Sequence, residues 1–227
     1  MPNRISLVVP LRAFVSGKTR LAPALAIDER RRIAEACARS VLCSATAVRV
    51  ERVVVCEDDD TERWALSIGA NFARVSTTGL NESLDAARLA ETCTADTVVI
   101  AHGDLPLADR LVDDVLEIAS TNASCDVLIV TDRHEDGTNV LVLPRQRLGD
   151  WRFAYGPGSK DRHLAEAARL GLRVRALTHP RLSVDLDTVD DLALPAVAAF
   201  VEMVLRPGPD TVGTGSETMT NETGSDR

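Results

Sequence analysis

Apolar and polar positions along the chain follow two alternating patterns. Short continuous apolar runs are typical of strands that a parallel sheet buries on both faces. They predict strands at 5–9, 52–56, 72–75, 97–101, 126–130, 138–143, 172–177 and 182–184. Apolar positions spaced three and four residues apart predict amphipathic helices. These are expected at 28–45, 61–68, 82–91, 109–119, 162–170 and 188–204. Asp28 can cap the first helix, and Pro195 breaks the last one.

The alternation of strands and helices predicts an α/β fold of three layers, in which a mostly parallel, mixed sheet carries helices on both faces. Residues 1–205 are expected to form a single domain, because the sequence contains no internal repeat and no clear linker. From Arg206 onward the composition changes to Pro, Gly, Ser, Thr and acidic residues, with almost nothing to bury. The segment 206–227 is therefore predicted to be a disordered tail.

The composition excludes several classes of function. The chain has 227 residues and a net charge of −8, and only 3% of its residues are aromatic. Nucleic-acid binding rests on phosphate neutralisation by Lys and Arg and on aromatic stacking, so nucleic acid is not expected as a partner. No apolar run reaches the roughly 18 residues of a membrane span, and the N-terminal residues lack a secretory pattern. The five cysteines form no CxxC pair, which suits a reduced compartment. A cytoplasmic protein without a membrane partner is expected.

Ligands of open α/β sheets bind at the carboxyl ends of the strands, so the residues after each strand are the candidates for chemistry. After the first predicted strand, a loop carries three cations, Arg12, Lys18 and Arg20. Gly17-Lys18-Thr19 resembles the end of a P-loop, but that motif needs a further glycine at the position that Arg12 occupies. A loop with this charge suits a triphosphate. The alternative is a solvated basic loop.

Three aspartates near the ends of predicted strands suit a hard divalent cation. Asp104 follows the fourth predicted strand, where a carboxylate is either a magnesium ligand or a turn former and helix cap. Asp185 and Asp187 stand two residues apart, so in a strand both point to one side. Two like charges so placed repel one another unless a cation lies between them. The alternative for Asp187 is that it caps the helix that begins at Thr188.

Two glycine-containing loops suit an anionic substrate, because exposed backbone N–H groups ahead of a helix bind phosphate or carboxylate. One leads to Thr138, and the other holds Gly156 and Ser159. The alternative is a plain turn with Ser159 as the helix cap. Asn81 also stands before a predicted helix, either as its cap or as a contact to the edge of a base. His102, a lone histidine, is expected to be structural.

Six segments, taken in order and at their spacing, resemble one family. They are the loop Pro10 to Leu21, Gly79-Leu80-Asn81, Gly103-Asp104-Leu105-Pro106, Asp136-Gly137-Thr138-Asn139, Tyr155-Gly156-Pro157-Gly158-Ser159 with His163, and Asp185-Leu186-Asp187-Thr188. They are similar to the guanylyltransferases of coenzyme F-420 biosynthesis, which act on 2-phospho-L-lactate, phosphoenolpyruvate or 3-phospho-D-glycerate. The resemblance covers residues 5–193. It implies a nucleotidyltransferase fold, like that of the molybdenum-cofactor and sugar-nucleotide enzymes.

The resemblance also implies roles for individual residues. The ligands of Mg²⁺ would be Asp104, Asp185 and Asp187. The phosphate and carboxylate of the acid substrate would be bound by Thr138, Gly156 and Ser159. GTP would be bound by Arg12, Lys18 and Asn81, and the catalytic residues would be Lys18, Arg20 and Asp104. Many relatives carry Lys where this chain has Arg12, and a planar guanidinium differs in geometry from a point charge.

The reaction that the resemblance implies joins a phosphorylated three-carbon acid to GMP from GTP and releases pyrophosphate. A phosphate monoester has its second pKa near 6, so its dianion needs no general base near pH 7. The form of Gly156-Pro157-Gly158-Ser159 most resembles that of the relatives that use phosphoenolpyruvate, so the resemblance favours this acid over the other two. The product would pass to a transferase that adds it to the deazaflavin precursor. The alternatives are another nucleotidyltransferase, such as a molybdopterin guanylyl- or cytidylyltransferase, and a nucleotide-binding domain without catalysis.

Overall fold

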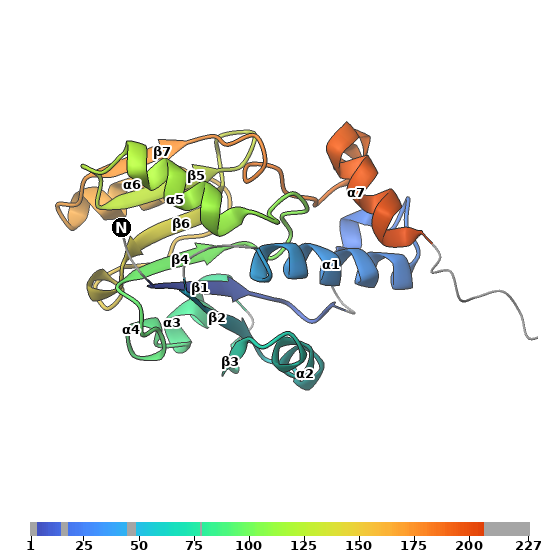
Figure 1. Cartoon of the computed structure of the whole chain (residues 1–227), viewed down its shortest axis with the longest axis horizontal. Helices are drawn as coiled ribbons and strands as arrows, with labels where there is room; N and C mark the ends of the chain where they lie inside the picture. Colours follow the sequence, from blue (N-terminus) through green and yellow to red (C-terminus); the bar gives the residue numbers. More distant parts are fainter. Residues whose placement is uncertain (1–3, 15–17, 45–48, 78, 207–227) are drawn as a thin grey trace, which may run out of the picture.

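The computed structural model describes residues 4–14, 18–44, 49–77 and 79–206. Within them, seven strands form one sheet in the order β3-β2-β1-β4-β6-β5-β7 (Figure 1). The strands are β1 Arg4–Pro10, β2 Arg49–Cys56, β3 Asn71–Arg74, β4 Thr97–Ala101, β5 Val127–Thr131, β6 Thr138–Pro144 and β7 Val174–Leu177. The α-helices are α1 Ile27–Leu42, α2 Asp59–Ser67, α3 Leu80–Ala86, α4 Leu89–Thr92, α5 Leu111–Thr121, α6 Ser159–Arg169 and α7 Pro195–Leu205. Short 3-10 helices are η2 Thr19–Leu21, η3 Arg145–Arg147 and η4 Val189–Ala193.

The sheet is mixed because β6 runs against both of its neighbours, β4 and β5. The other strand pairs are parallel. Ala101, at the end of β4, pairs with Val140, near the start of β6. The first residue of β6, Thr138, therefore lies at the same edge of the sheet as the carboxyl ends of the parallel strands. The prediction of a mostly parallel, mixed sheet is confirmed.

Helices cover both faces of the sheet (Figure 1). On one face, α1, α2 and α5 bury residues such as Val41, Ala65 and Val115. On the other, α3, α4 and α6 bury Leu84, Leu89 and Ala167. Helix α7 packs on α1, where Val197 meets Ile33 and Cys37. These packing contacts confirm the three-layer α/β prediction.

Two predicted elements were wrong. Leu182 and Ser183 lie in a turn and Val184 in the coil after it, so no strand forms there, and the Ser183 hydroxyl accepts a hydrogen bond from the backbone N–H of His179. The helix predicted at 82–91 is two helices, α3 and α4, with Arg88 between them at a φ of 48°. Leu84 and Leu89 are both buried, and five residues of one continuous helix would turn them to different sides. The break lets both reach the same core.

The start of α1 differs from the prediction, and the predicted C-terminal tail falls outside the described residues. Helix α1 begins one residue before Asp28, with Ala26 as its N-cap, and the Glu29 side chain accepts the N–H of Ala26. Asp28 is therefore inside the first turn and is not the cap. The predicted tail lies outside the described residues, apart from Arg206. None of the described helices is long and apolar enough to span a membrane.

Candidate active site

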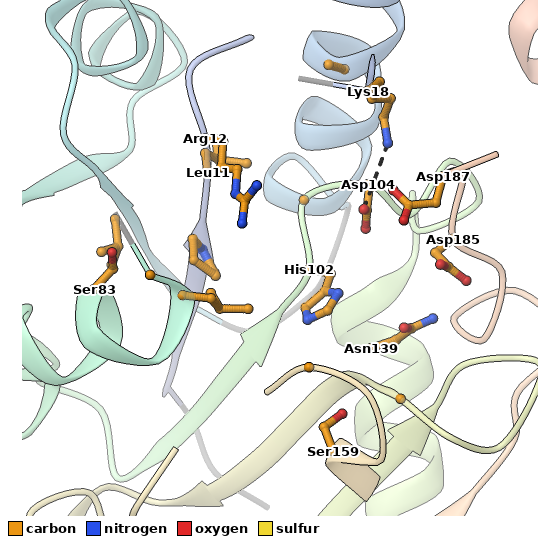
Figure 2. A pocket seen from close by; sticks show the side chains of 18 of the residues that line it. Leu11, Arg12, Lys18, Ser83, His102, Asp104, Asn139, Ser159, Asp185 and Asp187 are labelled. Carbon is orange, nitrogen blue, oxygen red and sulfur yellow. Dashed lines mark ion pairs between the residues drawn. The ribbon is translucent and has the colours of Figure 1, made fainter. Parts of the chain in front are cut away.

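A cavity of about 800 Å³ opens at the edge of the sheet where β1, β2 and β4 end and β6 begins (Figure 2). Its lining includes every candidate site residue from the sequence except Asn81. These residues are Arg12, Lys18, Arg20, Asp104, Thr138, Gly156, Ser159, Asp185 and Asp187. Segments far apart in the sequence thus meet around one space. We refer below to the cationic loop (Arg12, Lys18 and Arg20), the acidic cluster (Asp104, Asp185 and Asp187) and the anion subsite (Thr138, Gly156 and Ser159).

The acidic cluster is held together by the backbone. The N–H of Leu186 donates to the carbonyl oxygen of Asp104 at 3.0 Å, and the Leu186 side chain is fully buried. Its neighbours Asp185 and Asp187 both line the cavity, as the two-residue spacing predicts, although this segment is extended coil after a turn and not a strand. The register against Asp104 therefore brings all three carboxylates to one wall.

The charges of the acidic cluster are only partly compensated. Burial raises the pKa of the Asp185 carboxyl, and the negative charges of Asp104 and Asp187 raise it further. Oδ1 of Asp104 is buried and has no hydrogen-bond partner among the described residues. Neighbouring carboxylates that repel one another, one of them with an unpartnered oxygen, suit a hard divalent cation. Among the described residues, no group of three or more His, Cys, Asp or Glu side chains is placed so that it could hold a metal ion, so the metal assignment stays a prediction.

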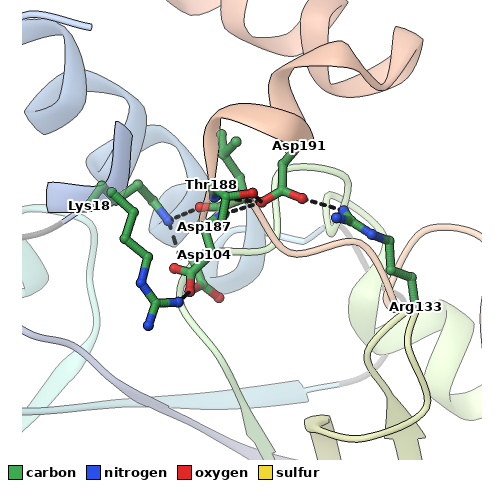
Figure 3. Close-up of polar contacts among 8 residues, drawn as sticks. Lys18, Asp104, Arg133, Asp187, Thr188 and Asp191 are labelled. Carbon is green, nitrogen blue, oxygen red and sulfur yellow. Dashed lines mark hydrogen bonds and ion pairs between the residues drawn. The ribbon is translucent and has the colours of Figure 1, made fainter. Parts of the chain in front are cut away.

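Lys18 extends from the cationic loop into the acidic cluster (Figure 3). Its Nζ donates to the carbonyl oxygen of Leu186 and lies 3.8 Å from Oδ2 of Asp104. The Lys18 side chain is only 7% exposed. Arg20, in contrast, is exposed and forms a 3.3 Å ion pair with Asp187. Arg12 lines the opposite part of the cavity (Figure 2) and has no ion pair with the described residues.

A buried carboxylate, Asp191, supports the acidic cluster from behind (Figure 3). Its Oδ2 accepts the backbone N–H groups of Asp187 at 2.8 Å and Thr188 at 2.6 Å, and also the Thr188 hydroxyl. Its Oδ1 forms an ion pair with Arg133. The cap of η4 is Thr188, with Asp191 as its partner. The alternative that Asp187 caps this helix is wrong. The Asp187 side chain faces the cavity instead and pairs there with Arg20.

The anion subsite is built around the start of α6. Gly156 and Gly158 have φ values of 112° and 70°, which residues with a Cβ rarely adopt. The Asp136 carboxylate accepts the N–H of Gly158, and the Asp136 carbonyl accepts the N–H of Lys160. These bonds fix the loop, and the first residue of α6, Ser159, lies in the cavity wall. Ser159 is 2% exposed, and its hydroxyl makes no hydrogen bond to the described residues.

Asn81 has a different position from the one expected. Its amide oxygen accepts the N–H of Tyr155 at 2.7 Å, and its amide nitrogen donates to the Tyr155 carbonyl at 3.2 Å. The N-cap of α3 is Gly79, not Asn81. Both polar atoms of the Asn81 amide are committed to this backbone, and Asn81 does not line the cavity. The geometry therefore makes Asn81 a link between α3 and the loop of the anion subsite, while its contact to a base stays a prediction.

Comparison with known proteins places the chain in a family. The family model described as "Guanylyl transferase CofC like" matches residues 5–195. The chain belongs to this family. It is 35% identical over 186 residues to a phosphoenolpyruvate guanylyltransferase of Roseiflexus castenholzii, covering 82% of this chain and 84% of the relative. It is 30% identical over 187 residues to a 2-phospho-L-lactate guanylyltransferase of Methanothermobacter thermautotrophicus, covering 82% and 81%.

Solved structures with low identity share the fold of this CofC-like chain. A nucleotidyl transferase from Methanothermobacter thermautotrophicus superposes with a TM-score of 0.59 at 17% identity, covering 88% of this chain and 98% of that one. Glucosyl-3-phosphoglycerate synthase from Mycobacterium tuberculosis, in complex with Mn²⁺ and UDP, gives a TM-score of 0.56 at 18% identity, covering 88% and 79%. The nucleotidyltransferase fold that the sequence resemblance implies is confirmed.

Two residues that line the cavity of this guanylyltransferase-like chain were missed as site candidates. His102 lies between the acidic cluster and the anion subsite (Figure 2), and its Nε2 is buried without a partner among the described residues. Its two-residue spacing from Asp104 is the signal that could have found it. Asn139 donates to the carbonyl of Leu182 at 3.1 Å and so anchors the turn before Asp185. Its place directly after Thr138 is the corresponding signal.

Proposed function

We propose that this chain transfers GMP from GTP to a phosphorylated three-carbon acid, with phosphoenolpyruvate favoured, and releases pyrophosphate in coenzyme F-420 biosynthesis. The observation that carries the proposal is the arrangement of one cavity, around which the cationic loop, the acidic cluster and the anion subsite all lie. Family membership supports the guanylyl group, and the names of the relatives support the acid. The product would then pass to a transferase that adds it to the deazaflavin precursor.

The reaction needs positioning and charge stabilisation more than proton transfer. An oxygen of the acid's phosphate attacks the α-phosphorus of GTP and forms a new P–O bond. The bond from the α-phosphorus to the oxygen that bridges it to the β-phosphate breaks, and this oxygen leaves with pyrophosphate. The attacking phosphate is mostly a dianion near pH 7, so no general base is required. The task of the protein is to bring two polyanions together and to stabilise the leaving group.

The side chains around the cavity divide this task. Lys18 and Arg20 bind the triphosphate and stabilise the charge that develops on pyrophosphate. Lys18 is already ordered against the acidic cluster by its bond to the Leu186 carbonyl. A Mg²⁺ ion held by Asp104, Asp185 and Asp187 would neutralise phosphate oxygens. The N-terminus of α6, with the hydroxyls of the anion subsite, holds the acid substrate.

The full-length protein incubated with GTP, Mg²⁺ and one acid at a time tests this function. We expect pyrophosphate release with phosphoenolpyruvate, at a higher kcat/KM than with 2-phospho-L-lactate or 3-phospho-D-glycerate. Mass spectrometry should identify a guanosine diphosphate conjugate of the acid. CTP and ATP serve as controls for the choice of base. Pyrophosphate release with a molybdopterin or a sugar phosphate, and with none of these acids, would contradict the proposal.

Replacing Ser159 by Ala is expected to raise KM for the acid by about tenfold and to leave KM for GTP nearly unchanged, because a hydrogen bond to a charged group is lost. The Ser159 hydroxyl is enclosed by the cavity wall and has no competing partner among the described residues. Steady-state kinetics with each substrate varied in turn measure the two constants. Ser120→Ala, at an exposed position near the end of α5, is the matched control. Equal changes in both KM values would remove Ser159 from the anion subsite.

A further inference from the structure

One buried histidine contacts the anion subsite but has no part in the chemistry described so far. His163 lies in α6, one turn after Ser159, and its side chain is fully buried. Its Nδ1 lies 3.0 Å from the Thr138 hydroxyl oxygen. Its Nε2 accepts the backbone N–H of Ala154 at 3.2 Å. Both ring nitrogens are therefore engaged, one by the loop before α6 and one by the first residue of β6.

These two bonds determine where the imidazole proton lies. A backbone N–H can only donate, so Nε2 of His163 carries a lone pair and no proton. A neutral imidazole then carries its proton on Nδ1, and Nδ1 donates to the hydroxyl oxygen of Thr138. The reverse direction, with Thr138 donating to Nδ1, would leave the ring without any proton. A doubly protonated ring would set an N–H against the N–H of Ala154.

The electrostatic surroundings of His163 agree with a neutral ring. The pKa of His163 is lowered to about 4, chiefly by burial and also by the charges of Arg162 and His102, against the opposing charge of Glu166. The rings of Trp151 and Tyr155 pack against the imidazole, with centroids 6.0 Å and 4.8 Å away. The ring therefore stays neutral, and fixed in orientation, across the pH range in which the enzyme would work.

We infer that His163 is a positioning residue that turns the Thr138 hydroxyl into a one-way donor toward an anionic oxygen of the acid substrate. The Thr138 oxygen accepts from His163, so the hydroxyl proton of Thr138 is not used in that bond. This proton has no acceptor among the described residues, and since Thr138 lines the cavity, it is directed there. The anion subsite thus offers directed donors and selects for groups that only accept, such as carboxylate or phosphate oxygens. This inference rests on the proposed function for the identity of the ligand.

Two substitutions of His163 separate its two hydrogen bonds. Gln places an amide near the position of Nε2, so His163→Gln keeps an acceptor for Ala154 and loses the donor to Thr138. Asn places an amide near the position of Nδ1, so His163→Asn keeps a donor to Thr138 and loses the acceptor. We expect His163→Gln to raise KM for the acid by about tenfold with KM for GTP within about twofold, and His163→Asn to raise it much less. Equal rises in both KM values, or an equal effect of Gln and Asn, would overturn the inference.

A double substitution tests whether the effect passes through the Thr138 hydroxyl. Thr138→Val removes the hydroxyl and keeps the shape of the side chain. If His163 acts only by orienting that hydroxyl, Thr138→Val combined with His163→Gln has the same KM for the acid as Thr138→Val alone. If the two effects multiply instead, His163 acts on the acid by another route and the inference is wrong.

A measurement on the unsubstituted protein keeps the inference testable even if the variants fold poorly. Nitrogen-15 NMR of the imidazole rings reports which ring nitrogen carries a proton, and the contacts of the His163 ring with the rings of Trp151 and Tyr155 assign its signal in the unsubstituted protein. We expect a proton on Nδ1 and none on Nε2 at pH 7, in the absence of substrates. A proton on Nε2 would overturn the inference, whether or not the enzyme turns over any acid. Absence of turnover together with the Nδ1 proton would instead count against the proposed function.

Discussion

Asp185→Asn and Asp187→Asn are each expected to lower the rate of pyrophosphate release by at least roughly a hundredfold at saturating Mg²⁺, with the fold intact, because they remove carboxylates proposed to hold the Mg²⁺ that would neutralise the reacting phosphates. Both carboxylates line the cavity beside Asp104, whose Oδ1 lacks a partner among the described residues. Asn keeps the size of the side chain and removes its charge. The loss is therefore expected in kcat, not in solubility or folding. Retained turnover in either variant would reject the acidic cluster as a metal site.

The stability of the Asp185 variant is expected to change in the opposite direction from its activity. The raised pKa of Asp185 means that its ionised form destabilises the fold. The Asp185 side chain contributes most to the free energy of unfolding at a pH below its pKa in the unfolded chain, about 4. This contribution decreases as the pH rises through the higher pKa of Asp185 in the folded protein. Without added metal, Asp185→Asn should therefore have a higher Tm than the unsubstituted protein at pH 7. This difference should disappear towards pH 4.

A thermal shift experiment with Mg²⁺ separates metal binding from catalysis. A ligand that binds the native state raises Tm, so Mg²⁺ is expected to stabilise the unsubstituted protein. Asp185→Asn and Asp187→Asn should lose most of this shift. Asp190→Asn is the matched control, because Asp190 is exposed in η4 and has no ion pair with the described residues. A full Mg²⁺ shift in all three variants would mean that the ion binds elsewhere.

Much of the site could be predicted from the sequence because the fold brings strand ends together. Asp104 follows a strand so apolar that its position in the sheet is unambiguous, and a strand end in an open α/β sheet is where ligands bind. Asp185 and Asp187 needed only the two-residue period of extended backbone, which holds even though no strand forms there. Because this period belongs to any extended backbone, the prediction that Asp185 and Asp187 face the same side is correct, although the predicted strand does not form.

The roles of Asn81 and His163 could not be predicted, because both depend on partners distant in the sequence. Asn81 bonds to the backbone of Tyr155, 74 residues away, and nothing in a short motif shows this pairing. His163 bonds to Thr138, 25 residues away, at the start of β6. The position of Thr138 depends on the antiparallel pairing of β6 with β4, which no local sequence pattern reveals. Local patterns report which residue types gather at a strand end. They do not report which of those residues bind each other rather than a ligand.

Asp191 is the position where a change outside the cavity should have the largest effect. Its side chain is 4% exposed and accepts three hydrogen bonds at one oxygen while it pairs with Arg133 at the other. Burial alone would raise the pKa of Asp191, but the N–H groups of Thr188 and Asp187 and the Arg133 side chain outweigh burial and lower it. The ionised form is thus stabilised, and this stability is lost as pH falls below about 4.

Asp191→Asn is expected to destabilise the fold by about 3 kcal/mol, because one partner of a buried charge pair is removed. An amide cannot satisfy both sides: if its oxygen accepts the N–H groups of Asp187 and Thr188, its NH₂ faces the Arg133 guanidinium. For a domain of this size the loss corresponds to a Tm lower by roughly 10 °C at pH 7. The Tm difference should shrink below pH 4, where the native carboxylate is also lost. Thermal unfolding followed by circular dichroism across this pH range measures both effects.

The same substitution should lower kcat about tenfold at temperatures where the protein is folded, because the backbone of Asp187 loses its acceptor and supporting contacts of this kind tune a metal site. Arg133→Met is the informative partner variant: it removes the ion pair but leaves the carboxylate on the N–H groups of Asp187 and Thr188. It should therefore cost stability and spare most of kcat. Glu202→Gln, at an exposed ion pair with Arg206, should change neither. A normal kcat in Asp191→Asn would show that the Asp191 carboxylate contributes only to stability and that Asp187 keeps its position without this carboxylate.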